Sequence, residues 1–128
     1  MAQADDIETR DDIEWIVRTF YSTCFEDELL GPVFTDVAQM DLEDHMPIMC
    51  DFWETLLLDA DKYSRNAFRP HVGLNRKLPL EARHFNRWIE LWAATIDSRF
   101  EGPIAQFAKH RAWRMGSSML TRLQMINT

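Results

Sequence analysis

The sequence predicts an all-α domain built from four amphipathic helices in two antiparallel pairs. Apolar residues recur at three- and four-residue spacing in four long segments, which is the helical period. Gly-Pro pairs or a stretch rich in helix breakers separate these segments, and no segment alternates as a strand would. A length of 128 residues suits one domain, residues 1–128. Its first eight residues lack an apolar pattern and are expected to be flexible.

The first helix is expected to begin after Thr9 and to end at Gly31-Pro32. Thr9 and Asp12 have the spacing of a capping box, in which each satisfies a backbone N–H at the helix start. Seven apolar residues then follow the helical spacing without a gap: Ile13, Ile16, Val17, Phe20, Tyr21, Cys24 and Phe25.

A second helix is expected over residues 44–58. Proline is tolerated in the first turn of a helix but is costly in its interior, so Pro47 places the start near Asp44. The predicted buried stripe then consists of five residues: His45, Met49, Phe52, Trp53 and Leu56.

Residues 59–79 show no helical period and contain three helix breakers: Pro70, Gly73 and Pro79. A loop of this length in a small domain is unusual and tends to be functional or disordered. His71 lies in it among the apolar residues Phe68, Val72 and Leu74, which favours a loop packed onto the rest of the domain.

Two more helices are expected near residues 80–100 and from Pro103 to the C-terminus. The first has an apolar stripe of five residues: Phe85, Trp88, Trp92, Ile96 and Phe100. Gly102-Pro103 separates the two, since proline suits a first helical position. The last helix has a similar stripe: Ile104, Phe107, Ala108, Met115, Met119, Leu123 and Ile126.

Composition excludes several partners. The formal charge is −7 and no run of five basic residues occurs, so a nucleic acid is not expected. No apolar run is long enough to cross a bilayer, and the acidic N-terminus does not resemble a secretory signal, so a cytoplasmic protein without membrane contact is expected. Cys24 and Cys50 have no zinc-site spacing and are predicted to be small buried thiols.

Two of the four histidines are candidates for chemistry. His84 and His110 have basic neighbours, so His110 is expected in solvent and His84 at the surface or an edge, whereas His45 and His71 are expected to face an apolar interior. Zinc would need more converging ligands, and a hydrolytic site would need a placed nucleophile. Haem needs one axial imidazole, an apolar cleft and a few polar groups. Haem is therefore favoured, with simple core packing as the alternative.

Five ordered motifs resemble the group III truncated haemoglobins. FRPHVGL (residues 68–74) is similar to the segment carrying that family's iron-binding histidine. Phe20-Tyr21 and GPVF (residues 31–34) are similar to the family's first helix and the link that leaves it. HMPIMCDFW (residues 45–53) and HFNRWIELW (residues 84–92) resemble its next two helices. The resemblance runs from about residue 13 to residue 126.

The resemblance implies a globin-like two-over-two helical sandwich around haem b, the iron protoporphyrin IX. It makes His71 the axial ligand and assigns the opposite, distal side to Tyr21, His45 and Trp88. Phe34, Met49 and Phe52 would pack near the cofactor, and Arg65 and Arg69 are candidates for its propionates because they lie near His71. A separate possibility is that His45 binds the iron directly when no other ligand is present.

The resemblance implies binding of oxygen or another diatomic gas. Two donors such as Tyr21 and Trp88 would slow release of that ligand by about 10–1000-fold, which suits tight binding rather than delivery. A nitric-oxide dioxygenase or peroxidase-like enzyme is the first alternative. It would need an external reductase, since the chain has no dinucleotide-binding glycine motif. A haem-free helical interaction domain is the second, and a monomer or weak dimer is expected.

Overall fold

A computed structural model describes residues 4–37, 41–58, 71, 74–75 and 80–127. Across these residues the regular structure is helical, as the sequence predicts. The elements are α1 (Arg10–Glu26), the short π-helical turn η1 (Val33–Val37), α2 (Leu42–Leu58), α4 (Ala82–Asp97) and α5 (Pro103–Asn127).

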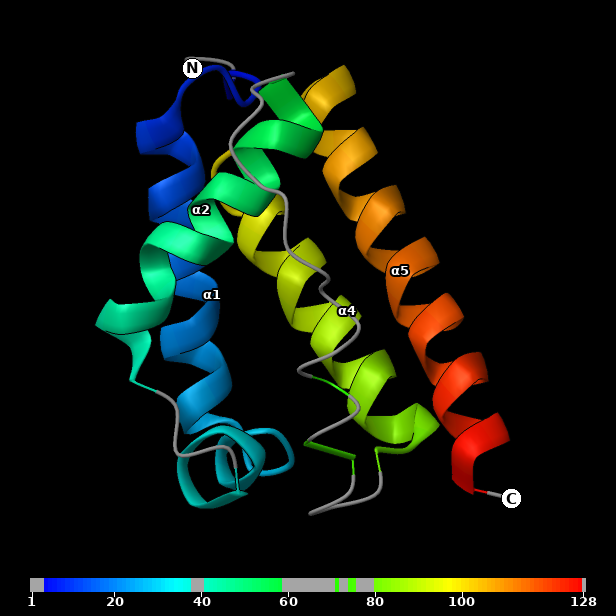
Figure 1. The fold of residues 1–128 in the computed structure, drawn as a ribbon. Helices are drawn as coiled ribbons and strands as arrows, with labels where there is room; N and C mark the ends of the chain where they lie inside the picture. Colours follow the sequence, from blue (N-terminus) through cyan, green and yellow to red (C-terminus); the bar gives the residue numbers. More distant parts are fainter. Residues whose placement is uncertain (1–3, 38–40, 59–70, 72–73, 76–79, 128) are drawn as a thin grey trace.

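The helices form two pairs. α2 packs across α1, α5 lies along α4, and α1 also contacts α4, which joins the pairs (Figure 1). The predicted architecture of paired helices in two layers is therefore confirmed. No helix in the described ranges has the length and apolar character to cross a membrane.

Trp92 of α4 lies at the centre of the core, where only 1% of its surface is exposed. Its ring stacks on Trp53 of α2 at a centroid distance of 4.4 Å, and its indole N–H donates to the Ala108 carbonyl of α5 at 3.2 Å. Phe20 of α1 meets the same ring edge-on at 5.1 Å. One tryptophan thus ties all four main helices together.

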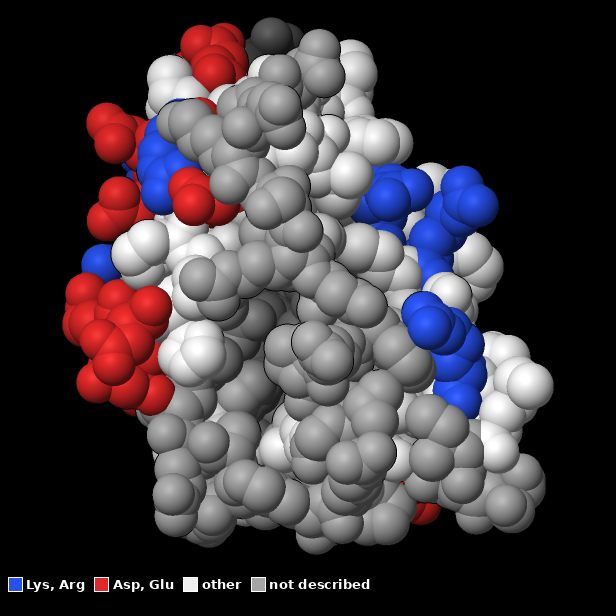
Figure 2. All heavy atoms as spheres, viewed as in Figure 1, with Lys and Arg blue, Asp and Glu red and all other residues white. Residues whose placement is uncertain are grey.

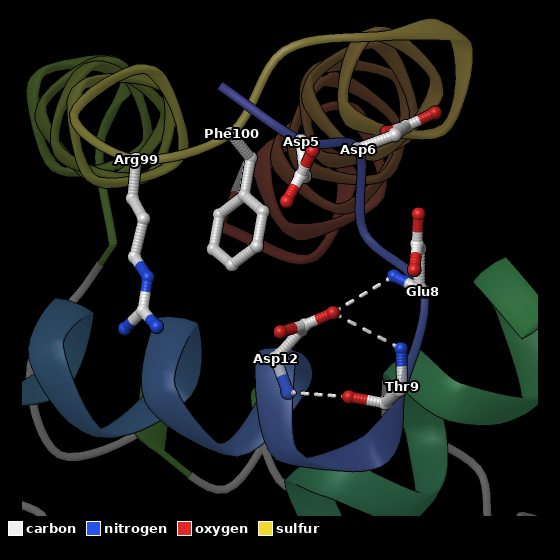
Figure 3. Close-up of a pocket in the computed structure, with 7 residues that line it drawn as sticks. All are labelled: Asp5, Asp6, Glu8, Thr9, Asp12, Arg99 and Phe100. Carbon is white, nitrogen blue, oxygen red and sulfur yellow. Dashed lines mark hydrogen bonds between the residues drawn. The ribbon is translucent and has the colours of Figure 1, made fainter. Parts of the chain in front are cut away.

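The start of α1 has the predicted capping box. The Thr9 hydroxyl accepts from the Asp12 N–H at 3.2 Å, and the Asp12 carboxylate accepts from the backbone N–H groups of Thr9 and Glu8 (Figure 3). The predicted end was too late, because α1 stops at Glu26 rather than at Gly31-Pro32. Asp27 ends it by accepting from the N–H groups of Leu29 and Leu30 with its side chain.

Within the N-terminal segment expected to be flexible, Asp5 and Asp6 contact the start of α5 and the turn before it. The Asp6 carboxylate accepts from the N–H groups of Ile104 at 2.9 Å and Ala105 at 2.8 Å, so it caps a helix 98 residues away in sequence. Ile7 is fully buried beside it. Gly102 has a φ of 143°, which favours glycine, and a Cβ there would lie 2.5 Å from the Asp6 carboxyl carbon.

A polar hollow of about 240 Å³ lies where this segment meets Phe100 and Arg99 (Figure 3). Its Asp6 carboxylate already caps α5, and its Asp12 carboxylate already accepts from the Glu8 and Thr9 N–H groups at the start of α1. The hollow therefore belongs to the structure of the N-terminus.

α2 begins at Leu42, two residues before the predicted start, because the Asp41 carboxylate accepts from the N–H groups of Glu43 and Asp44. Pro47 consequently lies inside the helix. The predicted buried stripe was also displaced. The residues that α2 buries are Met46, Cys50, Trp53 and Glu54, so Trp53 alone of the predicted stripe is buried.

The last two helices lie close to their predicted bounds. α4 is shorter than expected, and Phe100 follows it in the turn to α5 while remaining buried. α5 begins at Pro103 as predicted. Phe107 was expected on its apolar stripe but is 44% exposed, whereas Ala108 and Leu123 of the same stripe are buried as predicted; Ala105 and Ala112 face the core beside them.

Candidate functional site

The candidate site centres on two polar aromatic side chains, Tyr21 of α1 and Trp88 of α4, which both pack against Phe20. Burial raises the pKa of Tyr21 well above its usual range, and the nearby indole of Trp88 lowers the pKa by a smaller amount. The side chain therefore stays a neutral phenol. A neutral phenol keeps its proton, so the hydroxyl can donate it to a third group.

Aromatic rings surround the pair. Phe20 meets Tyr21 edge-on at 4.9 Å and Trp88 edge-on at 5.9 Å, so one buried ring holds both members. Phe34 of η1 meets Tyr21 at 5.6 Å and Phe25 at 5.8 Å. Tyr21, Trp88 and Phe34 are only half-buried although they pack against the core, which leaves part of each ring exposed.

α2 presents a second apolar face beside its buried one. Met49, Phe52 and Leu56 share this face at helical spacing and are half-buried against the same core. His45 lies one turn before Met49 on this face but is exposed. Its imidazole therefore does not lie in the apolar interior where the sequence was interpreted to place it.

An ion pair next to Trp88 joins α4 to the end of α1. Arg87 Nε donates to the Asp27 carboxylate at 2.8 Å, and only 8% of the Asp27 side chain is exposed. Burial would raise the pKa of Asp27, but hydrogen bonds from the Leu30 N–H and from Arg87 outweigh it and lower the pKa overall. The pair fixes the helix turn that carries Trp88 against the helix that carries Tyr21.

The predicted axial residue, His71, is half-buried and has a contact partner. Its chain neighbours at 70, 72 and 73 lie outside the described residues, as do Arg65 and Arg69. The structure thus brings together Tyr21, Trp88 and Phe34. It does not describe the surroundings of His71.

A comparison with solved structures supports this fold. No protein-family model and no curated protein matches the chain. A solved structure, the group III truncated haemoglobin from Campylobacter jejuni, is similar with a TM-score of 0.81. The match covers 94% of this chain and 95% of the other at 19% sequence identity. The chain has the truncated haemoglobin fold.

The side chains on and beside the Tyr21–Trp88 pair are of the types that a haem needs. A haem is a broad apolar plate that needs an axial imidazole and a few polar groups on the other side. Three apolar side chains, Phe34, Met49 and Phe52, are half-buried, so each has exposed surface that a cofactor could cover. The Tyr21–Trp88 pair supplies the polar groups.

His84 was misinterpreted from the sequence, whereas His110 is exposed as expected. His84 is buried, and its Nδ1 accepts from the Glu81 N–H at 3.0 Å at the start of α4. Burial and the nearby Arg83 lower the pKa of His84, although Glu81 opposes them. Its role is to cap the helix. The sequence signal for this role was the position of His84, which lies three residues after Glu81 in the first turn of α4.

Both cysteines are buried and free, as predicted. Burial raises the pKa of Cys24 to about 12 and that of Cys50 to about 11. The thiolate is the reactive form of cysteine, so neither thiol is expected to react at neutral pH in the folded protein.

Proposed function

We propose that this chain binds haem b and holds oxygen or another diatomic gas on the distal side. The observation that carries the proposal is the pair of polar aromatic side chains, Tyr21 and Trp88, which both pack edge-on against the buried ring of Phe20 and keep part of their surface exposed. The truncated haemoglobin fold supports the proposal, since the similar protein is a haemoglobin by name. His71 is the proposed axial ligand.

A bound haem iron would supply an open coordination position at which a diatomic ligand gains partial negative charge. Tyr21 is suited to that ligand because its pKa is raised, so the hydroxyl keeps the proton that it donates. Trp88 orients the hydroxyl by donating to its oxygen, and withdrawal of density from that oxygen strengthens the outgoing bond. Phe20 prevents both rings from turning away.

The remaining proposed contacts are apolar or peripheral. Met49, Phe52 and Phe34 would cover the cofactor and exclude water, because each packs on the core yet retains exposed surface. His45 would lie at the entrance rather than beside the ligand, since its side chain is exposed. Arg65 and Arg69 are proposed to pair with the propionates, and both lie outside the described residues.

The absorption spectrum of the purified protein tests the proposal. We expect an intense band near ~400–430 nm, a general property of haem, and saturation at one haem per chain when haemin is added. Carbon monoxide added to the reduced protein should shift that band. A colourless protein that does not take up haemin would overturn the proposal. Steady consumption of nitric oxide with an added reductase would instead show that the chain is an enzyme.

A further inference from the structure

The charges of this chain are divided between its two halves. Residues 1–61 contain 17 Asp and Glu against 2 Lys and Arg, a formal charge of −15. Residues 62–128 contain 4 Asp and Glu against 12 Lys and Arg, a formal charge of +8. Figure 2 shows the consequence on one face, where acidic side chains gather along the α1–α2 edge and basic ones along the opposite α5 edge. Each edge therefore attracts the other edge of a second molecule.

The α5 edge combines these charges with exposed apolar side chains. α5 carries four basic residues and no acidic one. Trp113 is 55% exposed with His110 stacked on it at 6.1 Å, and Phe107 is 44% exposed on the same helix. Arg114 is exposed and makes no ion pair with any described residue. We name Phe107, His110, Trp113 and Arg114 the α5 patch. Aromatic residues and arginine are the types enriched at protein interfaces.

The α1–α2 edge contains a hollow of about 190 Å³, which is comparable to a large side chain. Met46, Pro47 and Cys50 of α2 form its apolar part. Its two arginines are already neutralised, Arg10 by Asp51 and Glu54, and Arg18 by Glu14 and Glu43. Asp11 and Asp44 directly follow the lining residues Arg10 and Glu43 in the sequence. Both are exposed, and neither forms an ion pair with a described residue. The hollow is thus apolar at its base and acidic around it.

We propose that the α5 patch of one molecule docks into the α1–α2 hollow of a second copy of this chain, in a head-to-tail contact. Trp113 enters the hollow and Arg114 meets the surrounding carboxylates. The patch belongs to α5 and the hollow to α1 and α2, which lie on opposite sides of the molecule (Figure 1). We therefore expect a head-to-tail contact rather than a two-fold dimer that uses both surfaces at once. The contact is small, so association is weak and depends on protein concentration. This inference does not depend on haem binding.

Sedimentation velocity of the full-length protein, with any cofactor it carries, tests the contact. We expect the average sedimentation coefficient to rise with concentration up to about 1 mM protein at about 0.01 M salt, and this rise to vanish at about 1 M salt, where charges are screened. Trp113→Ala/Arg114→Glu changes only exposed side chains and should stay monomeric. Arg83→Glu changes the net charge by the same amount on α4 and should associate as the wild type does.

Mixing two variants that each lack one of the two surfaces tests whether the contact is head-to-tail. Glu14→Lys/Asp44→Lys reverses the acidic edge and should also be monomeric alone. Mixed with Trp113→Ala/Arg114→Glu, it should form a complex no larger than a dimer, because each variant retains the edge that the other has lost. Circular dichroism confirms that both variants are folded before mixing.

Three results would overturn the proposal. The first is a wild-type protein that remains monomeric at low salt over the whole concentration range. The second is association of Glu14→Lys/Asp44→Lys with itself, which would indicate a contact between two α5 helices. The third is a monomer that binds vesicles of anionic phospholipid through Trp113, which would assign the α5 patch to a membrane surface.

Discussion

Arg87 Nε lies 2.8 Å from the Asp27 carboxylate and ties the helix that carries Trp88 to the end of the helix that carries Tyr21. The same carboxylate accepts from the N–H groups of Leu29 and Leu30, so it also holds the chain that leads to Phe34. One buried carboxylate therefore sets the relative position of three elements around the candidate site.

Breaking this ion pair should disturb the distal side without removing any group from it. We expect Arg87→Ala to release the bound gas about fivefold faster, the effect of losing roughly one kcal/mol from the Tyr21 hydrogen bond. Arg87→Lys, which keeps one donor, should lie between that variant and the wild type. Arg83→Ala, an exposed residue one turn away, serves as the control. Equal release rates in all four proteins would show that the ion pair has no part in positioning Trp88.

The Tyr21 hydroxyl is expected to be the main donor to the ligand. Tyr21→Phe should raise the oxygen dissociation rate at least about tenfold, because a hydrogen bond to a partly charged acceptor is lost. Trp88→Phe should have a smaller effect. The double variant should lose less than the two single effects combined, since the proposed role of Trp88 is to orient the Tyr21 hydroxyl and the two effects are therefore coupled. Stopped-flow ligand replacement measures all three, and an unchanged rate in Tyr21→Phe would contradict the assignment.

The fold was most predictable where the deciding contacts are local. The capping box of Thr9 and Asp12 and the start of α5 at Pro103 depend on residues within one turn, and both were predicted. The Asp6 cap on α5 spans 98 residues of sequence, so no local pattern could indicate it. The first eight residues were interpreted as flexible for this reason.

Tertiary contacts also decide which face of a helix is buried. α2 has two apolar faces about a quarter-turn apart, one with Met46, Cys50 and Trp53 and one with Met49 and Phe52. Spacing identifies both faces but not which of them meets α1. For the candidate site, spacing indicated Tyr21 and Trp88 as core residues, and the resemblance to truncated haemoglobins gave them their roles. Their shared packing against Phe20 is evident only in the structure.

Removing the Asp6 cap should destabilise the whole domain. Asp6→Ala leaves the N–H groups of Ile104 and Ala105 without their acceptor, and we expect a loss of about 1–2 kcal/mol from the free energy of unfolding. Asp5→Ala is the matched control, because Asp5 contributes its backbone carbonyl to Glu101. Urea denaturation followed by circular dichroism measures both. Equal losses in the two variants would contradict the role of the Asp6 carboxylate as the cap.

His84 should make stability depend on pH. Its pKa in the folded protein is lowered, chiefly by burial, while the unfolded value is about 6.5. The unfolded chain therefore binds a proton first, so stability is full above about pH 6.5 and falls as the pH drops toward the folded pKa. We expect His84→Gln to lose this part of the dependence and His110→Gln to retain it, as measured by urea midpoints between pH 5 and 7.5 (roughly the range in which histidine titrates). The same slope in both variants would exclude His84 as its source.

The central claim is that His71 holds a haem iron, and the absorption spectrum of His71→Ala tests it most directly. We expect this variant to lose most of its haem during purification, or to retain it with an altered spectrum that added imidazole restores. His45→Ala and His110→Ala, which remove exposed imidazoles, should keep the wild-type haem content. A His71→Ala protein with full haem content and an unchanged spectrum would contradict the account.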